Sequence, residues 1–410
     1  MRLFETMRRA TILTALLAVA CSGETPRVFP PANELPLREA LPDPFVTFFG
    51  EEQIESADDW QKLRRPELIE LFEHYVCGVA PDAPAITARV ETPDVEIAPG
   101  VVHRGVEITL SPDAPRIHLG LFLPAGVAEP PVLLALNPCG NQSLVESEAV
   151  RFTASFRALG CGADRGSRQE RWPVLEILGR GYALATFHES DVDPDDPDDE
   201  RSLDGVHPHF DSGEGFRTAW GRLAAWAWGL SRAVDYLVTD ASVDATRIVV
   251  AGHSRRGKTA LLAAALDERI AIAIPHQSGT GGASLSRDNT GESVGVITTL
   301  FPNWFDDVFA TFADQEARLP VDQHLLIALV APRPVLVTNG VEDLRADPPG
   351  ALKAVQAAAP VYTLLGSRGL VLEDGRPSLD GPLSWHERTG GHSLEPRDWY
   401  TFMDFADRQW

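Results

Sequence analysis

Six short runs of apolar residues recur along the chain, separated by longer polar or amphipathic stretches. Their length is typical of buried strands and too short for buried helices. Because helical stretches lie between several of the runs, the pattern predicts strand–helix–strand units and a mostly parallel sheet covered by helices. The runs are residues 117–123, 132–136, 182–186, 248–251, 272–274 and 335–337.

One helix can be placed from its periodicity. Its apolar side chains recur in steps of three and four, so one stripe of this helix is expected to pack on the sheet. We assign these residues no chemistry, but the helix leads directly into the predicted strand at 248–251. The apolar positions are Leu223, Trp226, Leu230, Ala233 and Leu237.

The residues GHSRRGK at 252–258 follow that strand and precede a helix-forming run. A strand, a Gly-x-Ser-x-x-Gly turn and a helix form the context of a nucleophile elbow, which projects a serine at the carboxyl edge of the sheet. The pattern therefore predicts an α/β-hydrolase, a three-layer αβα sandwich, with Ser254 as the candidate nucleophile. The common motif has its second glycine where Arg256 stands, and a small residue in a tight turn is the alternative without chemistry.

A serine hydroxyl needs a base to activate it, and that base needs a carboxylate to orient it. In α/β-hydrolases the acid and then the histidine follow the serine along the chain. His392, in the glycine-rich stretch at 390–393, is our first candidate for the base. The alternatives are His276, directly after a strand, His324, before an apolar helix, and His386, which we place in a loop.

The candidate acid follows the predicted strand at 335–337. Asp343 lies just beyond the carboxyl end of this strand, where the acid of such a triad belongs. Glu342 and Asp347 are the fallbacks in the same stretch. An acidic surface loop without chemistry is the simpler alternative.

Charge excludes two classes of partner. The 410 residues hold 36 Lys and Arg against 59 Asp and Glu, a formal net charge of −23 at pH 7. Nucleic acids and anionic membrane surfaces would be repelled, so neither is expected as a partner. A hydrophobic fraction of 44% and a charged fraction of 23% are ordinary for a globular protein.

The start of the chain has the pattern of an export signal. Basic residues precede an apolar run at 10–20 that is too short to span a bilayer. Cys21 directly after it resembles the lipidated cysteine of a bacterial lipoprotein, and a plain signal peptide is the alternative. We divide the chain into a signal peptide at 1–20, an N-terminal arm at 21–59 and a catalytic domain at 60–410. We expect an exported monomer, which is secreted, periplasmic or anchored by lipid to the outer membrane.

Export changes how the other cysteines are interpreted. Cys139 and Cys161, 22 positions apart, could close a disulfide loop that contributes roughly 3 kcal/mol, with Cys77 left as a buried thiol. Three free cysteines are the alternative. No Cys and His spacing is typical of zinc, and we expect neither a metal nor an organic cofactor. The acidic stretch at 191–200 lacks the glycine and spacing of an EF-hand, so we expect a solvated loop there.

Several motifs together resemble those of one family, the glucuronoyl esterases of carbohydrate esterase family fifteen. The resemblance covers roughly residues 60–410, and its Ser-Arg-x-Gly-Lys signature is not shared with ordinary lipases. The matching stretches are SRAVDYL at 231–237, GHSRRGK at 252–258, SGTGGA at 278–283, LPVDQH at 319–324 and APRP at 331–334.

The resemblance implies an esterase that cleaves the bond between a glucuronic or 4-O-methylglucuronic acid carboxyl on xylan and a lignin alcohol. It implies that Ser254 is the nucleophile of an acyl-enzyme mechanism and His392 its base. Arg255 would supply a guanidinium to the oxyanion. Lys258 and Glu292 would hydrogen-bond the sugar hydroxyls, whereas the residues alone favour ordinary surface charges at both positions.

Two positions depart from the family pattern. Gln277 stands where one branch of the family has its triad Glu. An amide cannot carry the charge that stabilises an imidazolium, so the acid is expected to be Asp343, as in another branch. Arg345 stands where relatives commonly have Trp, and it is expected to bind a carboxylate or a decorated glycan in place of an indole.

Two other functions stay open at this point. An acetyl xylan esterase or a general carboxylesterase would use the same three residues on small acyl esters. A glycan-binding surface lipoprotein would keep the fold without turnover. The intact Ser, His and Asp candidates favour an enzyme over the binding protein.

Overall fold

The computed structural model describes residues 27–152, 161–195, 205–210 and 220–410. The predicted signal peptide and Cys21 lie outside the described residues. Within the described ranges, no helix is both long enough and apolar enough to cross a membrane.

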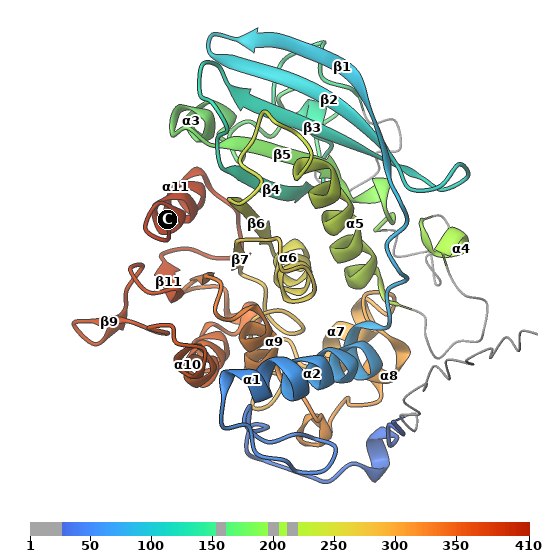
Figure 1. Ribbon diagram of the computed structural model, residues 1–410, viewed down its shortest axis with the longest axis vertical. Helices are drawn as coiled ribbons and strands as arrows, with labels where there is room; N and C mark the ends of the chain where they lie inside the picture. The colour runs from blue at the N-terminus through green and yellow to red at the C-terminus, as the bar shows by residue number, and fades with distance from the viewer. Residues whose placement is uncertain (1–26, 153–160, 196–204, 211–219) are drawn as a thin grey trace, which may run out of the picture.

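In these ranges, the strands form a nine-stranded sheet in the order β1-β2-β3-β5-β4-β6-β7-β8-β11 (Figure 1). The strands from β5 to β11 in this order are parallel, whereas β1, β2 and β3 pair antiparallel at one edge. A small ribbon of β9 and β10 lies apart from it. The strands are β1 (Thr87–Ala98), β2 (Val101–Thr109), β3 (Arg116–Pro124), β4 (Val132–Asn137), β5 (Ala183–His188), β6 (Ile248–His253), β7 (Ile272–His276), β8 (Val335–Gly340), β9 (Leu372–Glu373), β10 (Arg376–Pro377) and β11 (Leu383–Arg388).

Helices cover both faces of this sheet. The apolar faces of α5, α6, α9 and α10 share one core with the sheet, and those of α3 and α11 share a second core on the other side (Figure 1). The layers are therefore helix, sheet and helix, as in α/β-hydrolases. The helices are α1 (Ala57–Asp59), α2 (Arg65–Phe72), α3 (Val174–Gly179), α4 (His207–Phe210), α5 (Arg222–Leu237), α6 (Arg255–Leu266), α7 (Val294–Leu300), α8 (Asp307–Ala310), α9 (Gln323–Val330), α10 (Pro348–Leu364) and α11 (Pro396–Ala406).

The prediction of an α/β-hydrolase sandwich is confirmed. The six predicted strands correspond to β3 through β8, and the periodic helix to α5. The hydrophobic pattern missed β1 and β2. Most side chains of β1 are exposed and give no core signal, and β2 mixes buried with partly buried positions, so it has no continuous apolar run. The pattern also did not reveal that β3 runs antiparallel to β5.

The described part of the predicted N-terminal arm packs against the domain. Leu35 and Ile54 are buried in the core that also holds α2. The hydroxyl of Tyr75 donates to the carbonyl of Pro30 at 2.8 Å. The imidazole of His324 contacts the carbonyl of Pro42 at 2.9 Å, which gives this histidine a structural role in fastening the arm.

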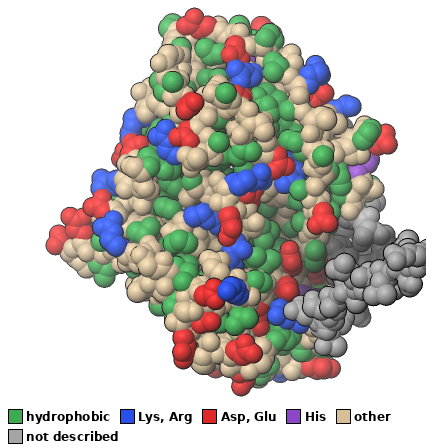
Figure 2. Space-filling view, in the orientation of Figure 1, with side chains coloured by type: hydrophobic (Ala, Val, Ile, Leu, Met, Phe, Trp, Pro, Cys, Tyr) green, Lys and Arg blue, Asp and Glu red, His purple; other side chains and the backbone are tan. Residues whose placement is uncertain are grey.

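Charged side chains of both signs are interspersed over the face shown in Figure 2. Basic side chains on this face are scattered among acidic ones rather than gathered into a stripe. A nucleic acid backbone requires clustered Lys and Arg, so this face offers no such surface.

Candidate active site

Ser254 lies in a strained turn between β6 and α6. Its φ of 62° and ψ of −126° put a non-glycine residue in a rarely populated region, and its amide donates to the carbonyl of His276 at 2.9 Å. At Gly252, a Cβ atom would lie only 2.1 Å from the carbonyl oxygen of Arg256, so a side chain cannot be accommodated there. The elbow thus holds the serine at the carboxyl edge of the parallel strands.

The structure brings Ser254, His392 and Asp343 into one hydrogen-bonded chain. Nε2 of His392 lies 2.9 Å from Oγ of Ser254, and Nδ1 lies 2.6 Å from Oδ2 of Asp343. The three residues come from the elbow, from the loop after β11 and from the loop after β8. Asp343 is buried, whereas His392 is exposed. This arrangement can take a proton from the hydroxyl and stabilise the resulting imidazolium.

The other candidate histidines face different partners. His276 is fully buried, with Nδ1 at 2.7 Å from Oγ1 of Thr338 and Nε2 at 3.0 Å from the carbonyl of Ser393. The placement of His386 in a loop is wrong. It belongs to β11 and pairs in register with Thr338. The prediction failed because β11 mixes buried and exposed positions, which resembles a loop in the sequence.

The two fallback acids lie in different settings from that of Asp343. The side chain of Glu342 is exposed to solvent. Asp347 is buried and accepts hydrogen bonds from the hydroxyls of Thr290 at 2.6 Å and Ser284 at 3.2 Å. Asp347 therefore ties together the loops around it.

The guanidinium of Arg255 is held by an anion and two rings. It pairs with Asp195, and its carbon lies 4.3 Å from the centre of the Trp304 ring and 5.0 Å from that of Phe301. The indole of Trp304 also donates to Asp195 at 3.2 Å. Sequence reasoning identified Arg255 and missed these three partners, which carry no motif.

The expectation of a solvated loop at 191–200 is wrong for its first half. Oδ2 of Asp191 accepts the backbone amide of His118 at 2.9 Å, and burial raises the pKa of Asp191 to about 7. Asp193 is fully buried, 3.1 Å from Nδ1 of His207. Asp191, Asp193 and Asp195 all contact other parts of the protein. Their spacing of two residues was the only feature of the sequence that could have indicated this. Residues 196–200 lie outside the described residues.

Lys258, Glu292 and Arg345 form a second group near the elbow. Nζ of Lys258 donates to the carbonyls of Ser278 at 2.5 Å and Thr280 at 2.6 Å, and burial lowers its pKa to about 7. Glu292 is buried and pairs with Arg345, whose Nε lies 3.0 Å from Oε1. The Arg345 side chain is itself 61% exposed, so it closes this group toward solvent.

A cavity of about 480 Å³ opens beside Ser254 and His392. Aromatic rings of Trp172, Phe301 and Trp304 line it, together with the guanidinium groups of Arg168 and Arg171. The rings of Phe301 and Trp304 are stacked, with centres 3.8 Å apart. Within the described residues, the Lys258 group does not line this cavity, so the serine lies between two different environments.

A disulfide borders the same cavity. Cys139 and Cys161 are bonded, with Cα atoms 5.5 Å apart, and both line the cavity wall. Cys77 is a buried free thiol, as the sequence suggested, and burial raises its pKa above the usual range.

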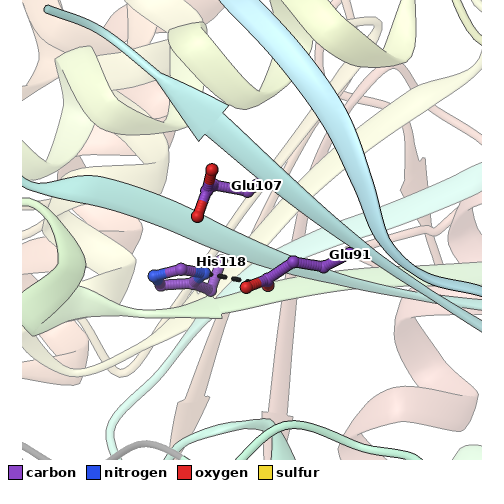
Figure 3. A group of neighbouring side chains, drawn as sticks. All are labelled: Glu91, Glu107 and His118. Atoms are coloured by element: carbon purple, nitrogen blue, oxygen red, sulfur yellow. Dashed lines mark hydrogen bonds and ion pairs between the residues drawn. The ribbon is translucent and has the colours of Figure 1, made fainter. Parts of the chain in front are cut away.

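One group of side chains outside the cavity offers metal-ligand atoms. Glu91, Glu107 and His118 lie on one face of β1, β2 and β3, with ligand atoms within 4.8 Å of one another (Figure 3). Arg151 pairs with Glu91 at 2.5 Å and Arg89 with Glu107 at 3.2 Å. Because these guanidinium groups already balance both carboxylates and repel a cation, we interpret the group as an ion-pair cluster.

The fold defines the class of the protein as an α/β-hydrolase, and comparisons define the family. The model of the fungal glucuronyl esterase family matches residues 173–366. Carbohydrate esterase MZ0003, from an unknown prokaryotic organism, is 37% identical over 384 residues, which cover 90% of this chain and 89% of that protein.

Two solved structures are similar along nearly their whole length. A promiscuous esterase of carbohydrate esterase family 15 from a marine bacterial metagenome has a TM-score of 0.84 and 36% identity, covering 92% of this chain and 99% of that one. A glucuronoyl esterase from Solibacter usitatus has a TM-score of 0.82 and 33% identity, with the same coverage. The chain belongs to the glucuronoyl esterase family, carbohydrate esterase family 15, and is a carboxylic ester hydrolase.

Proposed function

We propose that this enzyme hydrolyses glucuronoyl esters through an acyl-enzyme formed on Ser254. The observation that carries the proposal is the continuous chain from Asp343 through His392 to Ser254, with contacts of 2.6 and 2.9 Å. The similarity to a glucuronoyl esterase supports the acyl group.

The reaction proceeds in two halves. As Oγ of Ser254 attacks the ester carbonyl carbon, Nε2 of His392 takes the hydroxyl proton, and Asp343 stabilises the imidazolium through Nδ1. His392 then gives this proton to the alkoxide oxygen as the ester C–O bond breaks, and the alcohol leaves. Water attacks the acyl-enzyme with its proton passing to His392, which returns a proton to Ser254 as the uronic acid departs.

Charge on the tetrahedral intermediate is stabilised by Arg255 and the start of α6. The guanidinium is fixed by Asp195 and by the ring of Trp304, so it needs little reorganisation when the oxyanion forms. Free amides at the N-terminus of a helix add to this positive field.

The acyl side of the substrate is bound by Lys258, Glu292 and Arg345. A uronate ring presents several hydroxyls, which need charged or polar partners in a buried setting. Lys258 and Glu292 are both buried beside the elbow, and the exposed Arg345 replaces an indole with a cation. We infer that Arg345 shifts preference toward acyl groups that carry an anionic decoration.

The alcohol side faces the aromatic cavity. The leaving oxygen must lie near Nε2 of His392, and His392 lines this cavity together with stacked rings of Phe301 and Trp304. Rings of this kind bind aromatic alcohols through stacking. This supports an ester of glucuronoxylan with a lignin alcohol as the substrate. We propose that the enzyme is exported and meets this substrate outside the cell, with a lipid at Cys21 as its anchor.

A broader esterase is the second candidate. One solved relative is described as promiscuous, and the cavity of about 480 Å³ can admit small acyl esters as well. An acetyl xylan esterase or general carboxylesterase would use the same catalytic residues, so only relative rates distinguish these functions.

The test compares kcat/KM on benzyl glucuronate, acetylated xylan and p-nitrophenyl acetate, with Ser254→Ala as the blank. We expect a strong preference for the uronate ester, abolished in the blank. A preference for acetyl groups would replace the substrate while keeping the mechanism. Absence of turnover on all three would favour a glycan-binding protein, and turnover by the blank would refute the nucleophile.

A further inference from the structure

Gln277 is a buried, strained residue that the mechanism above does not use. It directly follows β7, is 1% exposed and has a φ of 47°. A residue without glycine's freedom keeps such a conformation only where its surroundings require it, and these sites cluster around functional groups.

The amide of Gln277 bonds to both neighbours of His392. Its Nε2 donates to the carbonyl of Gly391 at 2.8 Å, and its Oε1 accepts the backbone amide of Ser393 at 2.9 Å. The backbone carbonyl can only accept and the backbone N–H can only donate, so the orientation of the side-chain amide is fixed by its partners. The loop carrying the imidazole is therefore clamped on each side of His392.

Two further contacts fit the glutamine into this position. Nε2 of His253 lies 2.9 Å from Oε1 of Gln277, and burial holds the pKa of His253 well below its usual range, so this neutral ring donates its N–H. The His253 ring centre lies 4.5 Å from that of His392. At Gly340, a Cβ atom would come within 2.6 Å of Nε2 of Gln277, so only glycine lets the amide approach.

We propose that Gln277 is a positioning residue that holds His392 at Ser254 through the backbone of residues 391 and 393. The proposal rests on the proposed function, since it takes His392 as the base. It also assigns a reason for an amide here. A carboxylate at this position would face the carbonyl oxygen of Gly391 without a proton to donate, and would push the loop away.

The test is kcat and KM for Gln277→Glu, as a ratio to the unsubstituted enzyme, at about pH 5.5 and about pH 8. A protonated Glu can still donate to Gly391, whereas an ionised Glu cannot. We expect kcat to fall roughly 10- to 100-fold at the higher pH, with KM nearly unchanged, and to recover at the lower pH. The neighbouring titratable and charged groups are His253, His276, Arg256 and the His392–Asp343 pair. Because a new carboxylate shifts the pKa of a nearby imidazole, kcat is followed as a full pH profile for both enzymes, and a shifted midpoint is distinguished from a lost plateau at high pH.

The matched control is Gln323→Glu. Gln323 is also buried, and its Nε2 donates to the carbonyl of Gly282 at 2.6 Å, on a loop other than that of His392. We expect this variant to lose thermal stability without a kcat ratio that depends on pH. An equal pH dependence in both variants would reduce Gln277 to an ordinary buried amide and overturn the proposal.

A double variant separates positioning from acid function. If Gln277→Glu restored turnover to Asp343→Asn, the side chain would act on the imidazole itself, and the proposal would be wrong. We expect no such rescue. All rates are measured on the ester that the unsubstituted enzyme hydrolyses fastest, so the result does not depend on the uronate preference. Turnover by Ser254→Ala would instead refute the proposed function.

Discussion

The guanidinium carbon of Arg255 lies 4.3 Å from the centre of the Trp304 ring. Arg255 directly follows the candidate nucleophile Ser254 in the chain. Asp195 pairs with the same guanidinium and accepts the indole N–H of Trp304. The cation beside Ser254 is therefore fixed on two sides before any substrate arrives.

Replacement of Arg255 by Lys is expected to lower kcat by about two orders of magnitude, as removal of an oxyanion donor does elsewhere. Lysine keeps the charge but loses the planar fork that meets Asp195 and the flat face that covers Trp304. The measurement is kcat and KM on benzyl glucuronate. Arg269→Lys is the control: Arg269 pairs with Asp235 and Asp267 at the end of α6 opposite the elbow, and its replacement should leave kcat unchanged. Equal rates for both variants would contradict the oxyanion role.

Replacement of Glu292 by Gln is expected to raise KM for the uronate ester several-fold and to leave p-nitrophenyl acetate almost unaffected. The carboxylate is buried near Lys258 and is proposed to accept hydrogen bonds from the sugar hydroxyls. The acetate has no sugar hydroxyls, so its hydrolysis does not depend on this contact. Lys258→Met should act in the same direction. Glu268→Gln, at a side chain that is 66% exposed, is the control. A matching change on the acetate would show that Glu292 supports the elbow and not the sugar.

Replacement of Asp191 by Asn is expected to improve stability relative to the unsubstituted enzyme as pH rises. Burial raises the pKa of Asp191 to about 7, so between its unfolded pKa of about 4 and this value the folded state keeps a proton that the unfolded state has lost. Stability of the unsubstituted enzyme falls across that window. The difference in Tm should grow up to about pH 7 and then level off.

Asp113→Asn is the control for that experiment, because the Asp113 side chain is exposed. Its Tm difference from the unsubstituted enzyme should stay constant over the same range. A flat difference for Asp191→Asn as well would mean that this carboxyl ionises normally in the folded protein.

Replacement of Cys139 and Cys161 together by Ser is expected to lower the free energy of unfolding by roughly 3 kcal/mol, because the bond closes a loop between residues 22 positions apart. Reductant should destabilise the unsubstituted enzyme by a similar amount. Cys77→Ala is the control, since its thiol is free and buried, and it should respond to reductant as the unsubstituted enzyme does. A double variant as stable as the unsubstituted enzyme, together with no effect of reductant on the unsubstituted enzyme, would argue against the bond.

The sequence predicted the centre of the sheet and the elbow well, because buried parallel strands have continuous apolar runs and the Ser254 turn has its own motif. It did not predict β1, whose polar residues face solvent along most of its length. His386 was placed in a loop for a similar reason, since β11 mixes buried and exposed positions.

Contacts between site residues that are far apart in the sequence could not be predicted from the local sequence pattern. Asp195 belongs to an acidic stretch that resembles a solvated loop, and only the fold brings it to Arg255, 60 positions away. In the sequence, Gln277 was identified only as an amide at the position where one branch of the family has its triad Glu. Its two bonds to the backbone beside His392 span more than 110 positions and follow no periodicity.

The triad is tested most directly by kcat for Asp343→Asn beside Glu342→Gln on benzyl glucuronate. Asp343 lies 2.6 Å from Nδ1 of His392, whereas Glu342 is exposed. We expect the first variant to lose about three to four orders of magnitude in kcat and the second to be nearly unaffected. Loss of turnover in Glu342→Gln with activity retained in Asp343→Asn would contradict the assignment of the acid.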